Sequence, residues 1–358
     1  MARRCSLISV FILCAVLVTS AVPCRAGGWS YKESALPAIN GAPFQPKVSG
    51  DWAVSLHRVK SGTAYSTVGV VCYDLAKKQV YTIHEGKAVS PCISGNTIAF
   101  SGKLDNIPEL RGTTGKRGTW PSCLILFDLP TGASRAPVLK TNSAFVDSIS
   151  GNLVAYELGC RIYLYNMTTG AQQRISDNQA LNRDPDICGD LVVWLQYEDR
   201  TIKKSRVLCY RMSSGQTFAC SDEYTVHSRP NTDGTTIVWS TAAGTSVYDA
   251  KKGLVRIIPS AQYPDVSNGV VVYVTGSGCM CGCGSSGAGR GVYGSEVGSV
   301  GSFKIGTTNA DTPPAIDNRR VVWARGGVVY CADIQKVTQP SVSPGRSCPI
   351  PRAGAPGR

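Results

Sequence analysis

The chain has 358 residues and a formal net charge of +13, with 37 Lys and Arg against 24 Asp and Glu. This length allows two ordinary domains. The basic residues form no long run and no basic helix, which excludes a typical DNA- or RNA-binding protein. They either lie scattered over solvated surfaces or favour anionic partners such as an acidic polysaccharide.

The first element in chain order is a predicted secretory signal over residues 1–26. Arg3 and Arg4 precede an apolar run at 7–18, and small residues lead to a cleavage point after Ala26. The run is too short for a stable membrane span. We therefore expect a secreted or periplasmic protein with no transmembrane segment after signal removal. Cleavage would remove three arginines and no acidic residue, so the mature protein stays basic.

A ten-residue phrase then recurs seven times, at intervals of 34 to 56 residues. It reads Pro, any residue, Ile or Val, Ser or Asp, Gly or Asn, two variable residues, two apolar residues and an aromatic residue. The clearest copies include PDICGDLVVW at 185–194. The copies begin at Pro46, Pro91, Asp147, Pro185, Pro230, Pro264 and Pro314. A strand-like repeat of this length predicts an all-β propeller, a radial array of four-stranded sheets.

A second phrase follows within each repeat and supplies two more strands. In it, apolar residues alternate along the strand and are followed by an aromatic residue and then by Asp or Asn. A turn that contains Gly comes next, as in ILFDLPTG at 125–132. The first phrase therefore gives strands A and B, and the second gives strands C and D. The last repeat ends after strand C, near Gln335. We expect residues 36–40 to act as its fourth strand and close the ring, because closure removes exposed sheet edges.

The two phrases resemble the TolB-like β-propeller repeat, in which a Pro-x-Ile-Ser turn precedes an Ile-Ala-Phe strand and a Tyr-x-x-Asp strand. The resemblance covers residues 36–335, with Ile or Val in place of the usual Trp and Ser-Gly-Asn or Ser-Gly-Asp in place of Pro-Asp-Gly. It implies a propeller over residues 27–337, with seven blades, or six as the alternative. Relatives of this repeat include protein-interaction modules, peptidase gatekeepers and sugar lyases, so the fold does not choose the function. Residues 338–358 form a Pro-rich, basic tail for which we expect no fixed structure.

Antiparallel strand order places the A–B and C–D turns at one end of the ring, here called the turn end, and the B–C and D–A loops at the other, the loop end. Three long B–C insertions, 101–122, 196–206 and 275–301, therefore share the loop end. Variable loops on a rigid scaffold can form a binding site, and neutral loop variation is the alternative. Side chains suited to an anionic sugar or peptide are Arg111, Lys116, Arg117, Trp120, Tyr197, Arg200, Lys203 and Lys204.

The three histidines, His57, His84 and His227, also fall at the predicted loop end. A lyase or a metal-assisted hydrolase would need them to converge. They belong to blade one, to the connection between blades one and two, and to the connection between blades four and five, and they accompany no catalytic motif. We therefore interpret them as incidental loop residues or, at most, ligand contacts.

Three of the 15 cysteines lie in the predicted signal, and the even number that remains can pair fully in an oxidising compartment. Cys209 and Cys220 are the best disulfide candidate, because a two-residue turn at 214–215 would place them directly opposite each other. A Cys-x-Cys-x-Cys array in the third insertion is a weak candidate for a soft metal, with disulfide pairing or lack of fixed structure as the alternatives. Its members are Cys279, Cys281 and Cys283.

These patterns predict an exported, monomeric propeller without a cofactor, which acts as a binding or scaffold module for an envelope protein or an anionic polysaccharide. A polysaccharide-active lyase or hydrolase is the alternative, and a structural envelope protein without a specific ligand is a third. The Asp and Asn residues that end strand C are expected to bond to their own turns and not to act as catalytic acids. They are Asp74, Asp128, Asn166 and Asp249.

Overall fold

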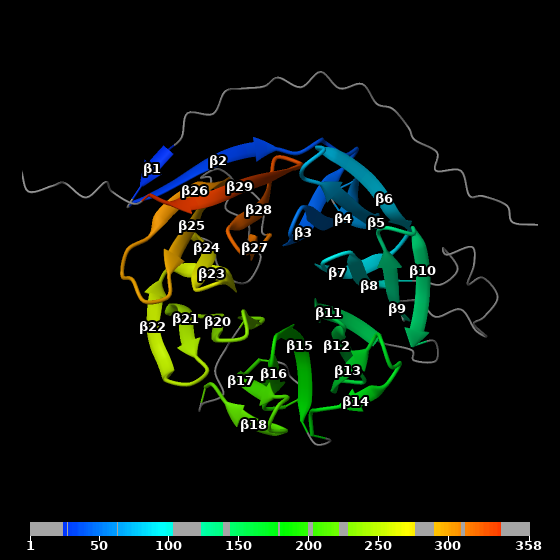
Figure 1. Ribbon diagram of the computed structural model, residues 1–358, viewed down its shortest axis with the longest axis vertical. Coiled ribbons are helices and arrows are strands. Elements are labelled where there is room, and N and C mark those ends of the chain that lie inside the picture. The colour runs from blue at the N-terminus through cyan, green and yellow to red at the C-terminus, as the bar shows by residue number, and fades with distance from the viewer. Residues whose placement is uncertain are drawn as a thin grey trace, which may run out of the picture.

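The computed structural model describes residues 24–26, 28–62, 64–102, 123–138, 144–177, 180–199, 203–221, 228–275, 290–308 and 312–337. These residues form seven antiparallel sheets arranged around a central channel (Figure 1). Each sheet has four strands, and one carries a fifth short strand at its edge. The predicted all-β, seven-bladed propeller is confirmed. Within the described part of the chain, no helix has the length and apolar character needed to cross a membrane.

The strands follow the predicted A, B, C, D order in each blade. Blade one has β3 (Ala42–Ser49), β4 (Trp52–Ser61), β5 (Ala64–Asp74) and β6 (Gln79–Glu85). Blade two has β7 (Ala88–Ser94), β8 (Thr97–Gly102), β9 (Cys123–Asp128) and β10 (Ala133–Val138). Blade three has β11 (Ala144–Ser150), β12 (Leu153–Leu158), β13 (Ile162–Asn166) and β14 (Gln172–Arg174). Blade four has β15 (Leu181–Cys188), β16 (Leu191–Tyr197), β17 (Ser205–Arg211) and β18 (Gln216–Ala219).

The remaining blades complete the ring. Blade five has β19 (Asn231–Thr232), β20 (Thr236–Thr241), β21 (Gly244–Asp249) and β22 (Gly253–Pro259). Blade six has β23 (Ala261–Ser267), β24 (Val270–Thr275), β25 (Arg290–Glu296) and β26 (Phe303–Thr308). Blade seven has β27 (Ala315–Asp317), β28 (Arg320–Arg325), β29 (Val328–Lys336) and β2 (Trp29–Ala35), with β1 (Cys24–Ala26) outside β2.

The ten-residue phrase recurs because each of its parts has a structural role. Its Gly or Asn lies at the A–B turn in the left-handed conformation, with φ of 55° at Gly50 and 58° at Asn318. Its closing aromatic lies on strand B and is buried between blades, as at Trp194 and Trp323. The Asp or Asn that ends strand C accepts backbone N–H groups of the next turn, for example Lys251 and Lys252 at 2.8 and 3.0 Å from Asp249 Oδ1.

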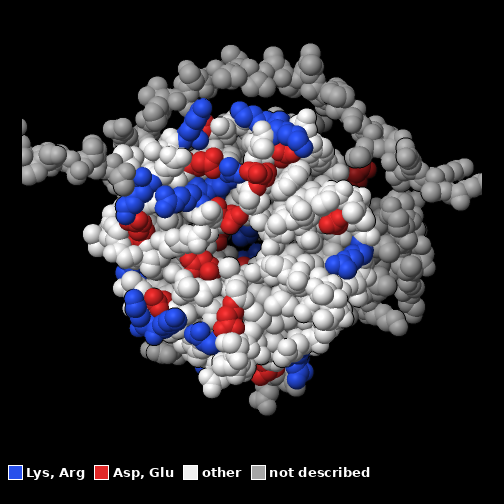
Figure 2. Space-filling model, viewed as in Figure 1, with Lys and Arg blue, Asp and Glu red and all other residues white. Residues whose placement is uncertain are grey.

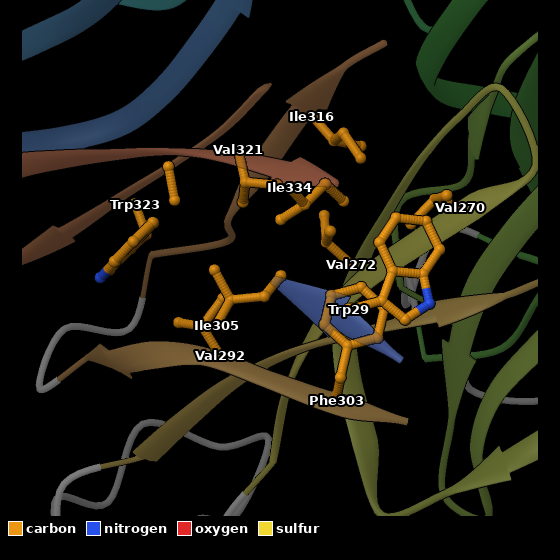
Figure 3. Close-up of a cluster of buried hydrophobic side chains, with 11 residues drawn as sticks. Trp29, Val270, Val272, Val292, Phe303, Ile305, Ile316, Val321, Trp323 and Ile334 are labelled. Atoms are coloured by element: carbon orange, nitrogen blue, oxygen red, sulfur yellow. The ribbon is translucent and has the colours of Figure 1, made fainter. Parts of the chain in front are cut away.

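The N-terminal part of the chain closes the ring, as predicted, but with a different segment. β2 pairs with β29 along its whole length, from Trp29 opposite Lys336 to Ala35 opposite Tyr330. Residues 36–40, expected to be the closing strand, form the connection that follows it. The Trp29 ring stacks on Phe303 of blade six at 4.7 Å, within an apolar cluster between blades six and seven (Figure 3). β1 takes in the last three residues of the predicted signal, whose removal stays a prediction.

Blade six keeps more of the repeat than its sequence indicates. Residues 290–296 lie in the Gly-rich segment that the sequence predicts as an insertion, but they form strand C of this blade. Residues 291–296 of this strand pair with β24. Phe303 begins strand D. Gly294 has the Phe303 ring so close that a Cβ atom would lie 2.4 Å from it, which explains a Gly where other blades have an apolar strand C residue.

Candidate functional site

The seven A strands line the central channel, which contains a cavity of about 310 Å³. Figure 2 shows its opening on one face, with acidic side chains beside the opening and basic side chains inside it. The charged residues that line the cavity are Lys47, Asp147, Asp186, Asp233, Asp265 and Asp317. The channel is therefore acidic, although the whole chain is basic.

At the turn end, hydrogen bonds between neighbouring blades form a belt around the channel. The fourth residue of the phrase in one blade accepts the backbone N–H group at the A–B turn of the next. Ser49 Oγ accepts from Gly95 N at 3.0 Å, and Asp317 Oδ2 accepts from Gly50 N at 2.7 Å, across the point of ring closure. The other acceptors of the belt are Ser94, Ser150, Asp233 and Ser267.

The belt is interrupted between blades four and five. Cys188 occupies the acceptor position there, and Gly234 N donates instead to Thr232 Oγ1 at 3.1 Å. Asp186, two residues before Cys188, makes the link between these blades by accepting Thr232 N at 2.7 Å. The phrase's Ser and Asp residues are thus structural acceptors, which the sequence pattern alone did not reveal.

Three charged side chains lie at the second position of the phrase, midway along strand A. Lys47 Nζ is 4.0 Å from Asp265 Oδ2, which also accepts Ile316 N at 3.0 Å. Burial raises the pKa of Asp186, and the positive charge of Lys47 opposes that rise. One cation therefore serves two carboxyl groups inside the channel.

Toward the loop end, Arg229 connects carboxyl groups of two other blades. Its Nη2 atom pairs with Asp147 Oδ1 of blade three, and its Nε atom is 3.8 Å from Asp184 Oδ1 of blade four. The Asp147 side chain is only 5% exposed, and its Oδ2 atom has no hydrogen-bond partner among the described residues. Burial raises the pKa of Asp147, and the Arg229 guanidinium opposes the rise.

A second acid–base pair lies beside the first. Glu157, at the end of β12, is 3.8 Å from Arg183 Nε, and its side chain is 12% exposed. Burial raises the pKa of Glu157 to about 7, with Arg183 opposing the rise and Asp184 adding to it. Tyr197 shares this environment, because burial and then the charge of Asp184 raise its pKa to about 12. We call Asp147, Glu157, Arg183, Asp184 and Arg229 the mouth cluster.

Bulges in strand A place these charges near the mouth. The pairing of β15 with β16 shifts between Arg183 and Asp186, and Asp184 has a φ of 53° immediately before Pro185. The pairing of β11 with β12 shifts at Asp147 in the same way. The same shift occurs in strand A of blades one, two and six, so the bulge belongs to the repeat, and only the charged residues placed on it distinguish blades three and four.

The structure brings one predicted ligand residue, Tyr197, to the mouth cluster. Lys203 and Lys204 are exposed, and Lys204 pairs with Glu198 at 3.6 Å. The other residues predicted in the loops lie outside the described residues. They are Arg111, Lys116, Arg117, Trp120, Arg200 and His227, with the metal candidates Cys279, Cys281 and Cys283.

The two described histidines lie toward the loop end but do not line the channel cavity. His57 Nε2 is 2.7 Å from the carbonyl oxygen of Asn40. His84 is buried against Phe100 of blade two at 5.1 Å, and burial lowers its pKa. Within the described ranges, no three His, Cys, Asp or Glu side chains are placed to hold a metal ion.

Cys209 and Cys220 are neighbours, but not in the predicted register. Cys209 pairs with Phe218, and Cys220 N bonds to Val207 O at 2.8 Å, so the two cysteines are diagonal partners on one face of the sheet. The turn between β17 and β18 is longer than the two residues assumed. Both thiols are free in the structure, and the Cys209 thiol hydrogen-bonds that of Cys220 and raises its pKa.

The sequence contains one signal of the mouth cluster. Asp147 is the only first residue of the seven phrases that is not Pro. Asp184 and Arg229 directly precede the Pro of their phrases, a position that is uncharged in the other five copies. The residue before the Pro lies at the same point of strand A in every blade. Charged residues at this point in adjacent blades therefore come close together at the mouth.

No protein-family model and no curated protein matches the sequence. Among solved structures, the β-propeller domain of the Trilobed protease from Pyrococcus furiosus superposes with a TM-score of 0.53, at 12% identity, over 84% of this chain and 97% of that one. An oligogalacturonate lyase from Vibrio parahaemolyticus has a TM-score of 0.55 at 10% identity, over 85% and 97%. TolB from Acinetobacter baumannii has a TM-score of 0.44 at 11% identity, over 80% and 82%, too low to support an argument. At such identities the likeness establishes the propeller fold alone.

Proposed function

We propose that the protein is an exported binding module of the cell envelope, which receives a cationic group of a protein partner at the mouth cluster. The observation that carries this proposal is the buried Asp147 carboxyl group, which lines the acidic channel. Its Oδ2 atom has no hydrogen-bond partner among the described residues. A buried polar atom without a partner costs free energy, and an ammonium or guanidinium donor would supply the missing hydrogen bond.

The charge of the channel supports a cationic group over an anionic one. The mouth cluster and the channel together hold more carboxyl groups than cations, the cations being Lys47, Arg183 and Arg229. An anionic sugar would meet net repulsion here. Of the two expected partner classes, a protein therefore fits this site better than an acidic polysaccharide.

Titration calorimetry with a lysine-rich peptide and its fully acetylated form tests the proposal. We expect the unmodified peptide alone to bind, and Asp184→Asn to weaken it about tenfold. Asp333→Asn, which removes an exposed carboxylate at the turn end, is the matched control and should change little. Affinity should rise between about pH 6 and 8, because ligand binding favours the ionised form of Glu157. Equal binding of the acetylated peptide would overturn the proposal.

A polysaccharide-active lyase or hydrolase is the second candidate, and Glu157 is the observation that favours it. A carboxyl group with a pKa of about 7, beside Arg183, can act as a general acid or base near neutral pH. Release of reducing ends or unsaturated products from acidic and neutral polysaccharides would test it. Activity that Glu157→Gln abolishes would replace the binding proposal, and absence of products with every polysaccharide would reject the enzyme.

Export further predicts that Cys209 and Cys220 become oxidised. Thiol–disulfide exchange with a disulfide donor would form their S–S bond and leave two thiols on the donor, as the adjacency of the two thiols allows. Mass spectrometry of non-reduced peptides from the exported protein should find the cross-linked pair. Two free thiols in that material would contradict the prediction.

A further inference from the structure

A hairpin of blade one extends beyond its sheet and belongs to neither the channel nor the mouth cluster. Strands β4 and β5 remain paired as far as Ser61 opposite Ala64. The exposed side chains near its tip include Tyr65, which is 49% exposed. The predicted insertions did not include this segment.

The guanidinium of Arg58 lies between two aromatic rings at this hairpin. Its Cζ atom is 4.3 Å from the centroid of Phe44 and 5.2 Å from that of Tyr65. Phe44 is fixed in turn by Ser55, whose buried hydroxyl accepts Phe44 N at 3.0 Å and donates to Phe44 O at 3.2 Å. Stacking between rings holds a long side chain in one orientation before any ligand arrives.

The base of the hairpin is also held against the connection that follows β2. His57 Nε2 is 2.7 Å from Asn40 O. At Gly41, with a φ of 147°, a Cβ atom would lie 2.5 Å from Arg58 O, so only Gly allows this close approach. The backbone that carries Arg58 is therefore attached to the ring at two places.

Arg58 stacks on aromatic rings but has no polar partner among the described residues. Arg325 of blade seven, in contrast, has both an aromatic contact and polar partners. Arg325 lies 3.8 Å from the Tyr330 ring and donates to Glu33 at 2.5 Å and to Thr307 at 3.0 Å. Among the described residues, Arg58 donates no hydrogen bond and forms no ion pair. The donors of a stacked, oriented guanidinium thus remain available.

A second cation lies on the same face of the hairpin. Lys60 is directly opposite Tyr65, and Arg58 is directly opposite Thr67. Because side chains two residues apart on a strand share a face, Arg58, Lys60 and Tyr65 lie together. Lys60 also has no ion-pair partner in the described part of the chain.

We propose that this face of the hairpin binds an acidic polysaccharide through the carboxylate of a uronic acid unit. The planar guanidinium of Arg58 matches a carboxylate with two parallel hydrogen bonds, and Lys60 adds positive charge. The half-exposed ring of Tyr65 offers a flat apolar surface on which the C–H groups of a sugar ring can pack. An acidic peptide has no sugar ring to make this contact. The site is separate from the mouth cluster and opposite to it in charge.

Binding of a uronic acid oligomer of defined length tests this site, with the same oligomer reduced at its carboxyl groups as the matched probe. We expect the acidic oligomer alone to bind, Arg58→Ala to weaken it about tenfold, and Tyr65→Ala to weaken it severalfold. Arg58→Lys should not restore full affinity, because it keeps the charge and loses the planar fork. Lys251→Ala, at an exposed turn of blade five, controls for the general positive charge.

Three results would overturn the proposal: equal binding of the reduced oligomer, an equal loss in Lys251→Ala, or stronger binding of polyglutamate than of the oligomer. Circular dichroism and thermal unfolding show whether each variant is folded. Asp184→Asn should leave oligomer binding unchanged, so failure of the mouth proposal and failure of this one can be told apart.

Discussion

The two ends of the central channel are built from the same seven A strands, yet they differ in chemistry. At the turn end, the belt pairs a Ser or Asp oxygen with a backbone N–H group in six of the seven blade junctions. At the loop end, the mouth cluster contains buried polar atoms that form no hydrogen bond with the described residues, including Asp147 Oδ2 and the Nε atoms of Arg183 and Arg229, although each Nε atom lies 3.8 Å from a carboxylate oxygen. The comparison separates residues whose hydrogen bonds hold the ring together from buried charged residues whose hydrogen-bonding capacity is only partly used.

The pKa values of carboxyl groups differ in the same way between the two ends. At the turn end, a hydrogen bond from Ser213 lowers the pKa of Asp190, and backbone hydrogen bonds from Lys251 and Lys252 lower that of Asp249. At the loop end, burial raises the pKa values of Asp147 and Glu157. Turn carboxylates are stabilised in their charged form, and mouth carboxyl groups are not.

The largest expected effect compares an arginine from each end. Arg229→Met leaves Asp147 buried without its counter-ion and should lower the free energy of unfolding by about 3 kcal/mol. Arg320→Met breaks pairs with Asp51 and Asp333, whose side chains are 68% and 56% exposed, and should cost about 1 kcal/mol or less. Denaturant unfolding measures both. Equal losses in the two variants would contradict the distinction between the two ends. Adding Asp147→Asn to Arg229→Met should recover part of the lost free energy of unfolding.

The pH dependence of stability gives a smaller effect with opposite signs at the two ends. Glu157 has a pKa of about 7 in the folded protein against the usual value of 4.5 for a glutamate side chain, so the folded state binds more protons between these pH values. Its contribution therefore falls as pH rises through that window. As the pH rises through this window, the free energy of unfolding of Glu157→Gln should increase by about 2 kcal/mol relative to that of the wild type.

Asp249→Asn is the control at the turn end. The folded pKa of Asp249 is lowered, so its contribution is present at neutral pH and is lost as pH falls through the folded pKa. This variant should therefore be less stable than the wild type at neutral pH, and the difference should shrink in acid. Thermal unfolding over a pH series measures both variants, and the same sign in each would contradict the comparison.

The smallest effect concerns single hydrogen bonds of the belt. Ser94→Ala removes the acceptor of Gly151 N and should cost about 1 kcal/mol. Cys188→Ala, at the same position of blade four where the belt is interrupted, should change the free energy of unfolding by less than about 0.5 kcal/mol. Equal costs would mean that the belt does not contribute through its hydrogen bonds.

Much of the fold could be predicted because its local signals repeat. Period-two alternation, the left-handed turn at residues such as Gly50 and Asn318, and the turn carboxylate at Asp249 each depend on neighbours in sequence. The closing strand was misplaced because 29–35 has no preceding phrase to mark it. Blade six was misread because Gly294, which makes room for Phe303, weakens the apolar pattern of strand C.

The candidate site could be predicted only in part. Tyr197 was expected to contact a ligand and lies beside the mouth cluster. Glu157 and Arg183 gave no signal, because a carboxyl group and a guanidinium 26 positions apart are unremarkable until two blades bring them to 3.8 Å. The register of Cys209 and Cys220 was wrong because the length of the intervening turn, not the spacing alone, sets the opposite residue.

The sequence by itself determined the propeller architecture, the strand order within a blade and which residues lie at each end of the ring, since these follow from local periodicity repeated along the chain. Only the tertiary structure decided which charges meet. Ring closure places the seven copies of one position around a single channel, where low solvent exposure changes the pKa of Asp147 and Glu157 and leaves polar atoms without partners. Burial and proximity depend on the whole ring, and no single repeat contains them.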